Sequence, residues 1–397
     1  MTASRDNLFT ATFFAMSAFS FTVFLSAFQL FPTAPFRIVA LGGTKFQAGL
    51  FLGFLTFASA LSAPFTGALA DRFGRRRTLV ASSLVIAGFA AAYLVTESPG
   101  SMLALAFAHG VFWSGLLSAS GAYATELMPV SRHAEGISYW GMASTLAVAV
   151  APSLGLWLWR GGWVPVCISV GVLNLGMAAI AWALPDDRKH RSPHPPAPRG
   201  GRWHDILEWR VTVVAFTMFL YSFGYGGITS FVALYTEANG VAPRGLYFTV
   251  FALTIMLTRP FTGRLADRIG HLRVFVPGVV LGTLGYVILA AGGSRPYLVL
   301  SALAFGTGFG SAYPIFAAHV LNHVSPARRA AAFGGILAAL DTGIGSGSMS
   351  LGWVIEHYGF RPAFGLAAVV ASLSVPYLLL VEPRMFGARR GAQPTRN

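Results

Sequence analysis

The sequence has few charged residues and a single cysteine. Charged side chains make up 11% of the 397 residues and hydrophobic ones 55%, whereas soluble domains carry about 25% charged residues. The one cysteine, Cys167, excludes an intramolecular disulfide framework and a cysteine-based metal site. This composition indicates that lipid surrounds most of the chain.

Acidic residues are scarcer still, with 14 Asp and Glu against 28 Lys and Arg. A nucleic-acid-binding protein would gather such an excess on one solvated face, whereas here the basic residues occupy short stretches between apolar runs. The sequence also lacks a P-loop, an HExxH and a GxSxG motif, which argues against ATP-driven or hydrolytic chemistry. We therefore expect a lipid bilayer as partner, no nucleic acid, no cofactor and no enzyme activity.

Apolar segments long enough to span a bilayer recur along the whole chain. A spanning helix needs about 20 mostly apolar residues, and twelve such segments can be counted. The first is too long for a signal-peptide core and has no cleavage site behind it, so we expect it to be retained. The expected spans are 8–31, 46–66, 77–96, 101–125, 136–158, 163–184, 209–236, 244–262, 274–292, 296–322, 330–355 and 360–381.

A stretch rich in proline and charge separates the sixth span from the seventh. Such a composition cannot join a packed helical bundle. The expected organisation is an N-terminal six-helix half, a cytoplasmic linker, a C-terminal six-helix half and a cytoplasmic tail, over 1–184, 185–208, 209–381 and 382–397.

The distribution of basic residues predicts the orientation, since short cytoplasmic loops retain Lys and Arg. With the N-terminus inside, 22 of the 28 basic residues fall on the cytoplasmic side. The other six are Arg37, Lys45, Arg160, Arg244, Arg295 and Arg361. We expect a multi-pass protein of a bacterial cytoplasmic (inner) membrane, with both termini cytoplasmic.

One motif is present twice. Pro64-Phe65-Thr66-Gly67, with Leu-Ala-Asp-Arg at 69–72 and Gly74, returns 196 residues later as Pro260-Phe261-Thr262-Gly263, with Leu-Ala-Asp-Arg at 265–268 and Gly270. The same offset relates Gly110 to Gly306. Parallel repeats of this kind predict a pseudo-twofold axis along the membrane normal, a midplane site between halves and alternating access by rocking.

The motif resembles the signature of the major facilitator superfamily, and the resemblance covers essentially the full chain. Residues 67–79 read G-x-L-A-D-R-x-G-R-R-x-x-L. The resemblance implies an all-α membrane transporter of two six-helix bundles. Residues 123–129, Arg132 and 136–155 are similar to the bacterial drug and sugar efflux branch, which exchanges exported small molecules for protons. Ala106 occupies the position of that branch's fourth-helix arginine.

The motif and the charges near it predict a cytoplasmic gate. Glycine permits a tight turn between helices, and Asp beside Arg forms charge-assisted bonds at a water-facing helix end. We expect this turn to lie in a cytoplasmic loop, with Glu126 and Glu135 beside Arg132 joining the network. The gate candidates are Gly67, Asp71, Arg72, Gly74, Arg75, Gly263, Asp267, Arg268, Gly270, Glu126 and Arg132.

Ionisable residues inside spans are candidates for proton coupling or substrate contact. Asp341 lies deep in the eleventh span and could take up and release a proton; a structural hydrogen bond or ion pair is the alternative. Arg259 could snorkel to the surface or pair with Asp341. His109 could relay protons or contact substrate, or else form an interhelical hydrogen bond.

His319 and His323 are four residues apart, a spacing that can hold a metal ion. No third ligand is close in sequence, so we interpret them as solvated histidines and expect no metal site.

Aromatic residues on the first, fourth, seventh and tenth spans predict the substrate class. Rings with few fixed charges suit apolar or amphipathic molecules, although lipid contact and helix packing claim part of any such set. The candidates are Phe24, Phe28, Gln29, Trp113, Tyr221, Tyr225, Phe305, Phe309 and Tyr313. We expect a proton-driven exporter of small amphipathic molecules, functional as a monomer; an uptake symporter and a lipid or organic-anion carrier are the alternatives.

Overall fold

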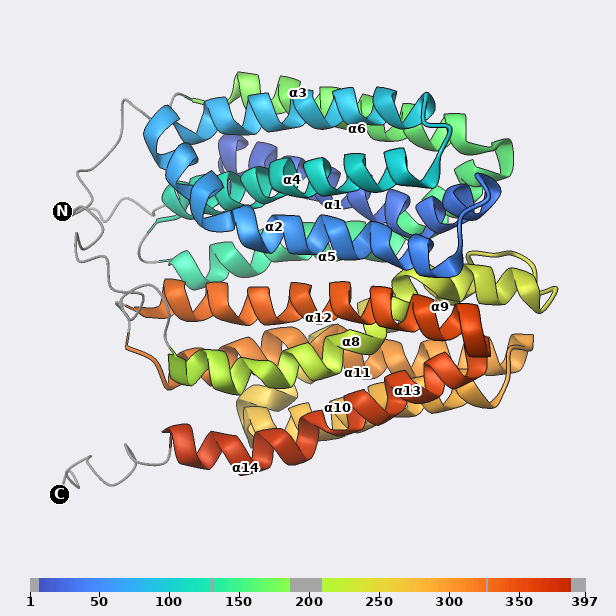
Figure 1. Cartoon of the computed structure of the whole chain (residues 1–397). Coiled ribbons are helices and arrows are strands. Elements are labelled where there is room, and N and C mark those ends of the chain that lie inside the picture. The colour runs from blue at the N-terminus through green and yellow to red at the C-terminus, as the bar shows by residue number, and fades with distance from the viewer. Residues whose placement is uncertain (1–6, 130–131, 186–208, 326–327, 387–397) are drawn as a thin grey trace, which may run out of the picture. The chain divides into compact units, whose positions relative to one another are not determined.

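A computed structural model of the chain describes residues 7–129, 132–185, 209–325 and 328–386. All regular structure in these ranges is helical (Figure 1). The chain divides into two compact units, Met1–His194 and Pro195–Asn397. The expected linker at 185–208, apart from Pro185, and most of the expected tail at 382–397 lie outside the described residues.

The first unit is a bundle of six long helices joined by short turns. Thr44 begins the second helix with a capping box: its hydroxyl accepts from the Gln47 N–H, and the Gln47 side chain accepts from the Thr44 N–H. The elements are α1 (Ala11–Ala40), α2 (Lys45–Phe73), α3 (Arg75–Leu94), α4 (Pro99–Leu127), α5 (His133–Leu158), the short 3-10 helix η2 (Trp159–Gly161) and α6 (Trp163–Ala183).

The second unit repeats this plan, with its last helix broken at Leu373. The elements are α8 (Trp209–Ala238), α9 (Leu246–Ile269), α10 (His271–Ala291), α11 (Arg295–Asn322), α12 (Arg329–Tyr358), α13 (Phe360–Ser372) and α14 (Ser374–Phe386). Within the described residues, eleven helical stretches are long and apolar enough to cross a membrane, one of them being the joined α13 and α14. With α12, the twelve predicted helices are present.

Several helices extend further than their expected spans. α1 continues through Pro32 and Pro35 to Ala40. Proline is tolerated in spanning helices because neighbouring helices can compensate for the lost backbone hydrogen bonds.

The duplicated motif was expected in a loop, and this expectation is wrong. Most of its residues belong to the ends of α2 and α9, and a single glycine forms each turn.

Glycines allow equivalent helices to pack closely in the two units. In the first, a Cβ at Gly110 of α4 would overlap the Leu55 carbonyl of α2. In the second, a Cβ at Gly306 of α11 would lie 3.1 Å from the Phe251 carbonyl of α9. Both pairs are related by the 196-residue offset. The sequence repeat is thus also a repeat of helix packing.

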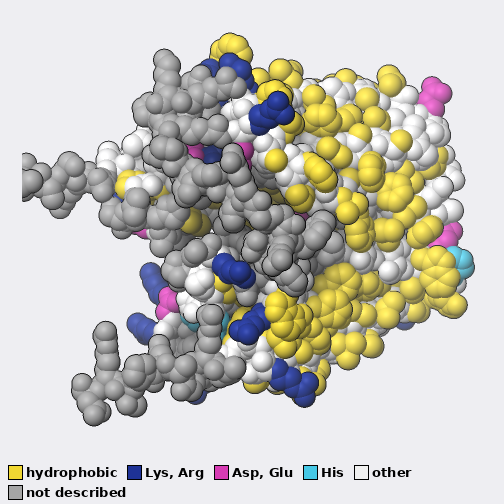
Figure 2. Space-filling model, turned by 60° about the vertical axis from the view of Figure 1, so that its left-hand side comes forward, with side chains coloured by type: hydrophobic (Ala, Val, Ile, Leu, Met, Phe, Trp, Pro, Cys, Tyr) yellow, Lys and Arg dark blue, Asp and Glu magenta, His cyan; other side chains and the backbone are white. Residues whose placement is uncertain are grey.

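Large hydrophobic side chains lie on the surface. Figure 2 shows them over much of the visible face, with Lys and Arg gathered toward one side of it. Phe65, Trp182 and Leu257 are 76%, 70% and 69% exposed. Surfaces of this kind are unfavourable in water and favourable in hydrocarbon, as the composition predicted.

Candidate functional site

Gly74 forms the turn between α2 and α3 by itself. It ends α2 and precedes the first residue of α3, with φ 98° and ψ 138°. Residues other than glycine avoid this region of backbone conformation. The turn therefore depends on glycine, as expected from the sequence.

Arg75 fastens this turn to the end of α4. Its guanidinium forms an ion pair with Glu126 and donates to the Ala122 carbonyl at 3.0 Å. Asp71, near the end of α2, lies 3.6 Å away. The Arg75 side chain is 14% exposed and that of Asp71 is 63% exposed. The contact with α4 is therefore the stronger one, because water screens the Asp71 pair.

Arg132 forms a separate pair with Glu135. Two hydrogen bonds of 2.9 and 2.8 Å join the guanidinium to the carboxylate. These bonds raise the pKa of the Arg132 guanidinium above its ordinary value. Glu126 and Glu135, which were expected to share one network with Arg132, thus pair with different arginines.

Another arginine of the first motif, Arg72, lies at the exposed end of α2. Its guanidinium is 5.7 Å from the centre of the Phe73 ring, a cation–π distance.

The second copy of the turn has the same backbone and different side chains. Gly270 repeats the conformation with φ 101°. His271 stands where the first copy has Arg75, and Asn322 where it has Glu126. Asp267 and Arg268 are exposed. Among the described residues, neither forms an ion pair comparable to that between Arg75 and Glu126.

Gly67 and Gly263 were expected to allow close approach or turning, and the structure gives them neither role. Both lie inside helices, at least six residues before the turn. No heavy atom is within 4 Å of where a Cβ would stand at either position.

Asp341 lies within α12, twelve residues from its first residue. At 1.5 Å per residue this is about 18 Å along the helix axis. The side chain is half-buried, and in the described part of the chain it forms no hydrogen bond or ion pair. Its carboxyl interacts electrostatically with the Tyr313 phenol of α11. Arg259 of α9 is half-buried and does not pair with Asp341 among the described residues.

The side chain of His109, a residue of α4, packs against α3. It is 2% exposed, stacks on Phe89 with ring centres 5.9 Å apart, and its Nδ1 is 3.4 Å from the Tyr93 hydroxyl. This enclosure by α3 favours the interhelical hydrogen bond over a role in proton relay.

In the first unit the structure brings three aromatic candidates together. Phe24 contacts Phe28, also on α1, and Trp113 of α4; the distances between ring centres are 6.1 and 5.7 Å. Gln29 differs from them, because it is fully buried and accepts a 2.9 Å hydrogen bond from Ser169 of α6. Its amide therefore joins α1 to α6.

In the second unit a larger aromatic cluster joins α8 and α11. Tyr225 lies 4.2 Å from Phe309, and Phe309 lies 5.7 Å from Tyr221 and 5.0 Å from Phe305, between ring centres. Phe305 is fully buried and Tyr221 is 1% exposed. Phe309 and Tyr313 are half-buried and thus remain accessible on α11.

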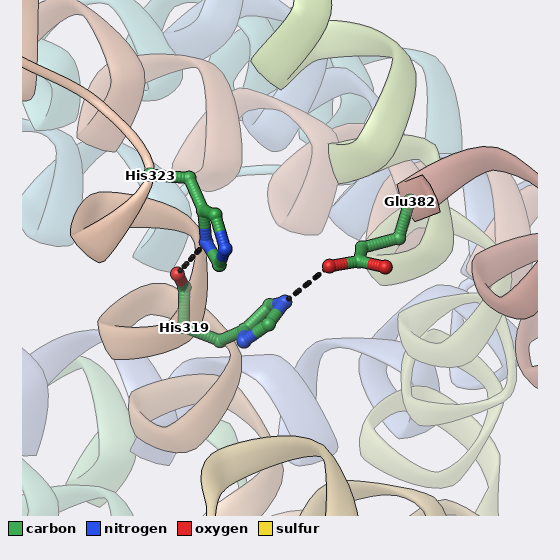
Figure 3. A group of neighbouring side chains, drawn as sticks. All are labelled: His319, His323 and Glu382. Carbon is green, nitrogen blue, oxygen red and sulfur yellow. Dashed lines mark hydrogen bonds and ion pairs between the residues drawn. The ribbon is translucent and has the colours of Figure 1, made fainter. Parts of the chain in front are cut away.

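Sequence analysis missed Glu382. It lies 59 residues after His323 in the chain, yet α14 brings its carboxylate beside His319 of α11 and His323, the residue that follows α11 (Figure 3). Spacing within one helix predicts contacts along that helix only, so no sequence signal could have found this third residue.

The fold defines a multi-pass membrane protein built from a duplicated six-helix unit. The sequence profile of the Major Facilitator Superfamily matches residues 8–242 and 214–395. The chain belongs to this superfamily of transporters. This confirms the expectation from the motif. Membership of a transporter family also agrees with the expectation that the protein is not an enzyme.

Curated relatives and solved structures agree with this assignment. An uncharacterized MFS-type transporter of Pseudomonas aeruginosa is 29% identical over 350 residues, covering 84% of this chain and 83% of its own. A Burkholderia pseudomallei one is 24% identical over 343 residues, with coverage of 84% and 83%.

Solved structures show the same fold. The nucleoside transporter NupG aligns with a TM-score of 0.71 at 17% identity, covering 95% of this chain and 99% of its own. A bacterial homologue of the human lysosomal transporter Spinster aligns with a TM-score of 0.75 at 17% identity, covering 95% and 97%. At these identities the likeness concerns the fold alone.

Proposed function

We propose that this secondary transporter exports small amphipathic molecules in exchange for protons, by rocker-switch alternating access, in a bacterial cytoplasmic membrane with both termini inside. The observation that carries the proposal is Asp341. An acidic side chain within a spanning helix is costly and is a functional candidate by default. This one has no hydrogen-bonding or ion-pair partner among the described residues, so its carboxyl is available to bind and release a proton.

The accessible aromatic side chains support the proposed substrate class. Phe24, Phe28, Phe309 and Tyr313 are half-buried on α1 and α11, and rings with few fixed charges bind apolar and amphipathic molecules. Tyr313 interacts with Asp341. A substrate on this face of α11 would therefore lie beside the proposed proton carrier. This proximity would couple substrate binding to the protonation of Asp341.

Transport in proteoliposomes tests the coupling. With an imposed pH gradient and a lipophilic fluorescent dye as substrate, the wild-type protein is expected to accumulate dye against its gradient. Asp341→Asn should abolish gradient-driven accumulation while retaining dye-for-dye exchange at equal pH, because substrate still binds. Glu356→Gln removes the same charge from the exposed end of α12 and should behave as wild type.

Gradient-driven accumulation by Asp341→Asn at the wild-type level would disprove the coupling role. Dye movement in the same direction as the protons would instead identify an uptake symporter.

A further inference from the structure

We propose that His319, His323 and Glu382 form a binding site for a divalent transition-metal ion of the zinc type, which links the end of α11 to α14. This site is separate from the proposed proton carrier. It rests on residues of one unit only, so it does not depend on how the transporter moves or on what it transports.

The three side chains converge from two helices. Figure 3 shows His319 in the last turn of α11 and His323 directly after that helix, with Glu382 of α14 opposite. One donor atom from each lies within 4.8 Å of the others. His319 Nε2 is 3.4 Å from the nearer Glu382 oxygen. Tetrahedral zinc binds nitrogen and oxygen at about 2.0–2.2 Å, which places neighbouring donor atoms about 3.4 Å apart.

The His323 ring is oriented as in a metal ligand. Its Nδ1 lies 2.9 Å from the His319 carbonyl, and a carbonyl can only accept, so Nδ1 carries the proton. The proton-free Nε2 is then the ligand atom. Ligating histidines almost always donate their other ring N–H in this way. Phe386 stacks on the ring, with centres 4.8 Å apart and planes 11° apart, and limits its rotation.

Burial favours an ion at this position. The side chains of His319 and Glu382 are only 9% and 12% exposed. A carboxylate taken out of water needs a compensating charge, and a divalent ion supplies it while the histidines stay neutral. A third imidazole, that of His271 at the start of α10, has its ring centre 6.5 Å from that of His319.

The first unit shows that joining these helices needs no such residues. The position equivalent to His319 by the 196-residue offset is Tyr123. Its hydroxyl donates to the Pro185 carbonyl after α6 at 2.9 Å, a neutral hydrogen bond that makes the corresponding connection. Leu127 is the equivalent of His323. The second unit thus carries two metal-ligating side chains where the first has a phenol and an alkyl group.

Zinc titration of the full-length protein tests the proposal. The purified chain, in detergent with its affinity tag removed and after treatment with a chelator, is titrated with Zn²⁺ by calorimetry. We expect one high-affinity ion per chain. His323→Gln and Glu382→Gln should each weaken binding by more than about 100-fold, because even substitutions outside the ligand set cost about 10- to 100-fold.

His357→Gln is the matched control. Like His323, His357 has its Nδ1 2.9 Å from the carbonyl one turn back, here that of Trp353, but it is not a member of the group. This variant should bind Zn²⁺ as wild type does. An absence of high-affinity Zn²⁺ in the wild-type protein, or equal binding by the Gln variants, would overturn the site.

A ligand exchange tests the site without removing it. His323→Cys should retain one ion, and Co²⁺ bound to this variant should show a sulfur-to-cobalt charge-transfer band that the wild type lacks. Since the metal stays bound, the test does not depend on a ligand-free site remaining folded. A His323→Cys protein that elutes as wild type from size-exclusion chromatography and shows no such band would contradict the proposal.

Discussion

Arg75 joins three groups at the α2–α3 turn, and these differ in strength. The Arg75 side chain is 14% exposed, whereas those of Glu126 and Asp71 are 39% and 63% exposed; the bond to the Ala122 carbonyl adds to the contact with α4. Arg75→Gln is expected to lower the free energy of unfolding by about 1.5 kcal/mol, the lower end of the range for hydrogen bonds to charged groups, because water screens the partly exposed Glu126. Asp71→Asn should cost less than about 0.5 kcal/mol. Chemical unfolding in detergent measures both, and equal losses would refute the ranking.

The two glycines of the first motif should respond differently to alanine. Gly74→Ala forces a side chain into a conformation that costs about 1–3 kcal/mol. Gly67→Ala fills open space inside a helix and should be neutral or stabilise by up to about 1 kcal/mol. Melting temperatures of the two variants provide the comparison; a larger loss for Gly67→Ala would contradict the structure.

Residue types could be predicted from the sequence better than their partners. The motif identified Arg75 as a charged residue at a turn, whereas Glu126 was grouped with Arg132 because the two are close in the chain. Pairing across helices depends on packing, which the motif does not encode. For the same reason Glu382 was not associated with His319.

At the scale of elements, α8 and α12 of the second unit pack with their backbones in close contact. A Cβ at Gly347 of α12 would overlap the Phe223 carbonyl, and one at Gly226 of α8 would overlap the Ile344 carbonyl. Small residues on both helices let the backbones touch, as is common in membranes.

Gly347→Ala should therefore destabilise the second unit. Overpacking typically costs about 1–3 kcal/mol, and we expect a loss of at least about 3 kcal/mol here because the added Cβ would overlap backbone. Gly334→Ala is the control in the same helix, since no heavy atom lies within 4 Å of a Cβ there. Thermal unfolding monitored by tryptophan fluorescence distinguishes the two variants. Equal melting temperatures would show that α8 and α12 are further apart than described.

Helix ends were the least predictable elements. The prolines in α1 and α2 resemble helix stops in water, where polar backbone groups can turn to solvent. A bilayer removes that option, so both helices continue to their next glycine or turn. The hydrophobic core of each span was predictable because it must match the bilayer thickness.

At the scale of the whole molecule, the single cysteine makes the predicted orientation testable. Cys167 is 2% exposed, so the wild-type protein should not react with a membrane-impermeant maleimide. Ser98→Cys, in the turn before α4, should react in intact cells, and Phe73→Cys, at the end of α2, should react only after permeabilisation. The reverse pattern would place the termini outside.

The overall architecture could be predicted from the sequence, whereas the transported molecule could not. Twelve apolar segments and a motif repeated after 196 residues are sufficient for the fold, since a membrane allows few others. Under the proposed function, substrate choice would depend on which rings stay accessible; Phe305 and Tyr221 are buried, whereas Phe309 and Tyr313 are half-buried.

The two glycine turns have the same backbone conformation, but different side chains stabilise them. The first has an arginine that reaches across to α4, and the second has a histidine in its place. The turn at Gly270 should therefore open faster than the turn at Gly74. Backbone amides beside Gly270 are expected to exchange with deuterium sooner than those beside Gly74, so the duplicated signature would act as a fixed pivot in one half and a looser hinge in the other.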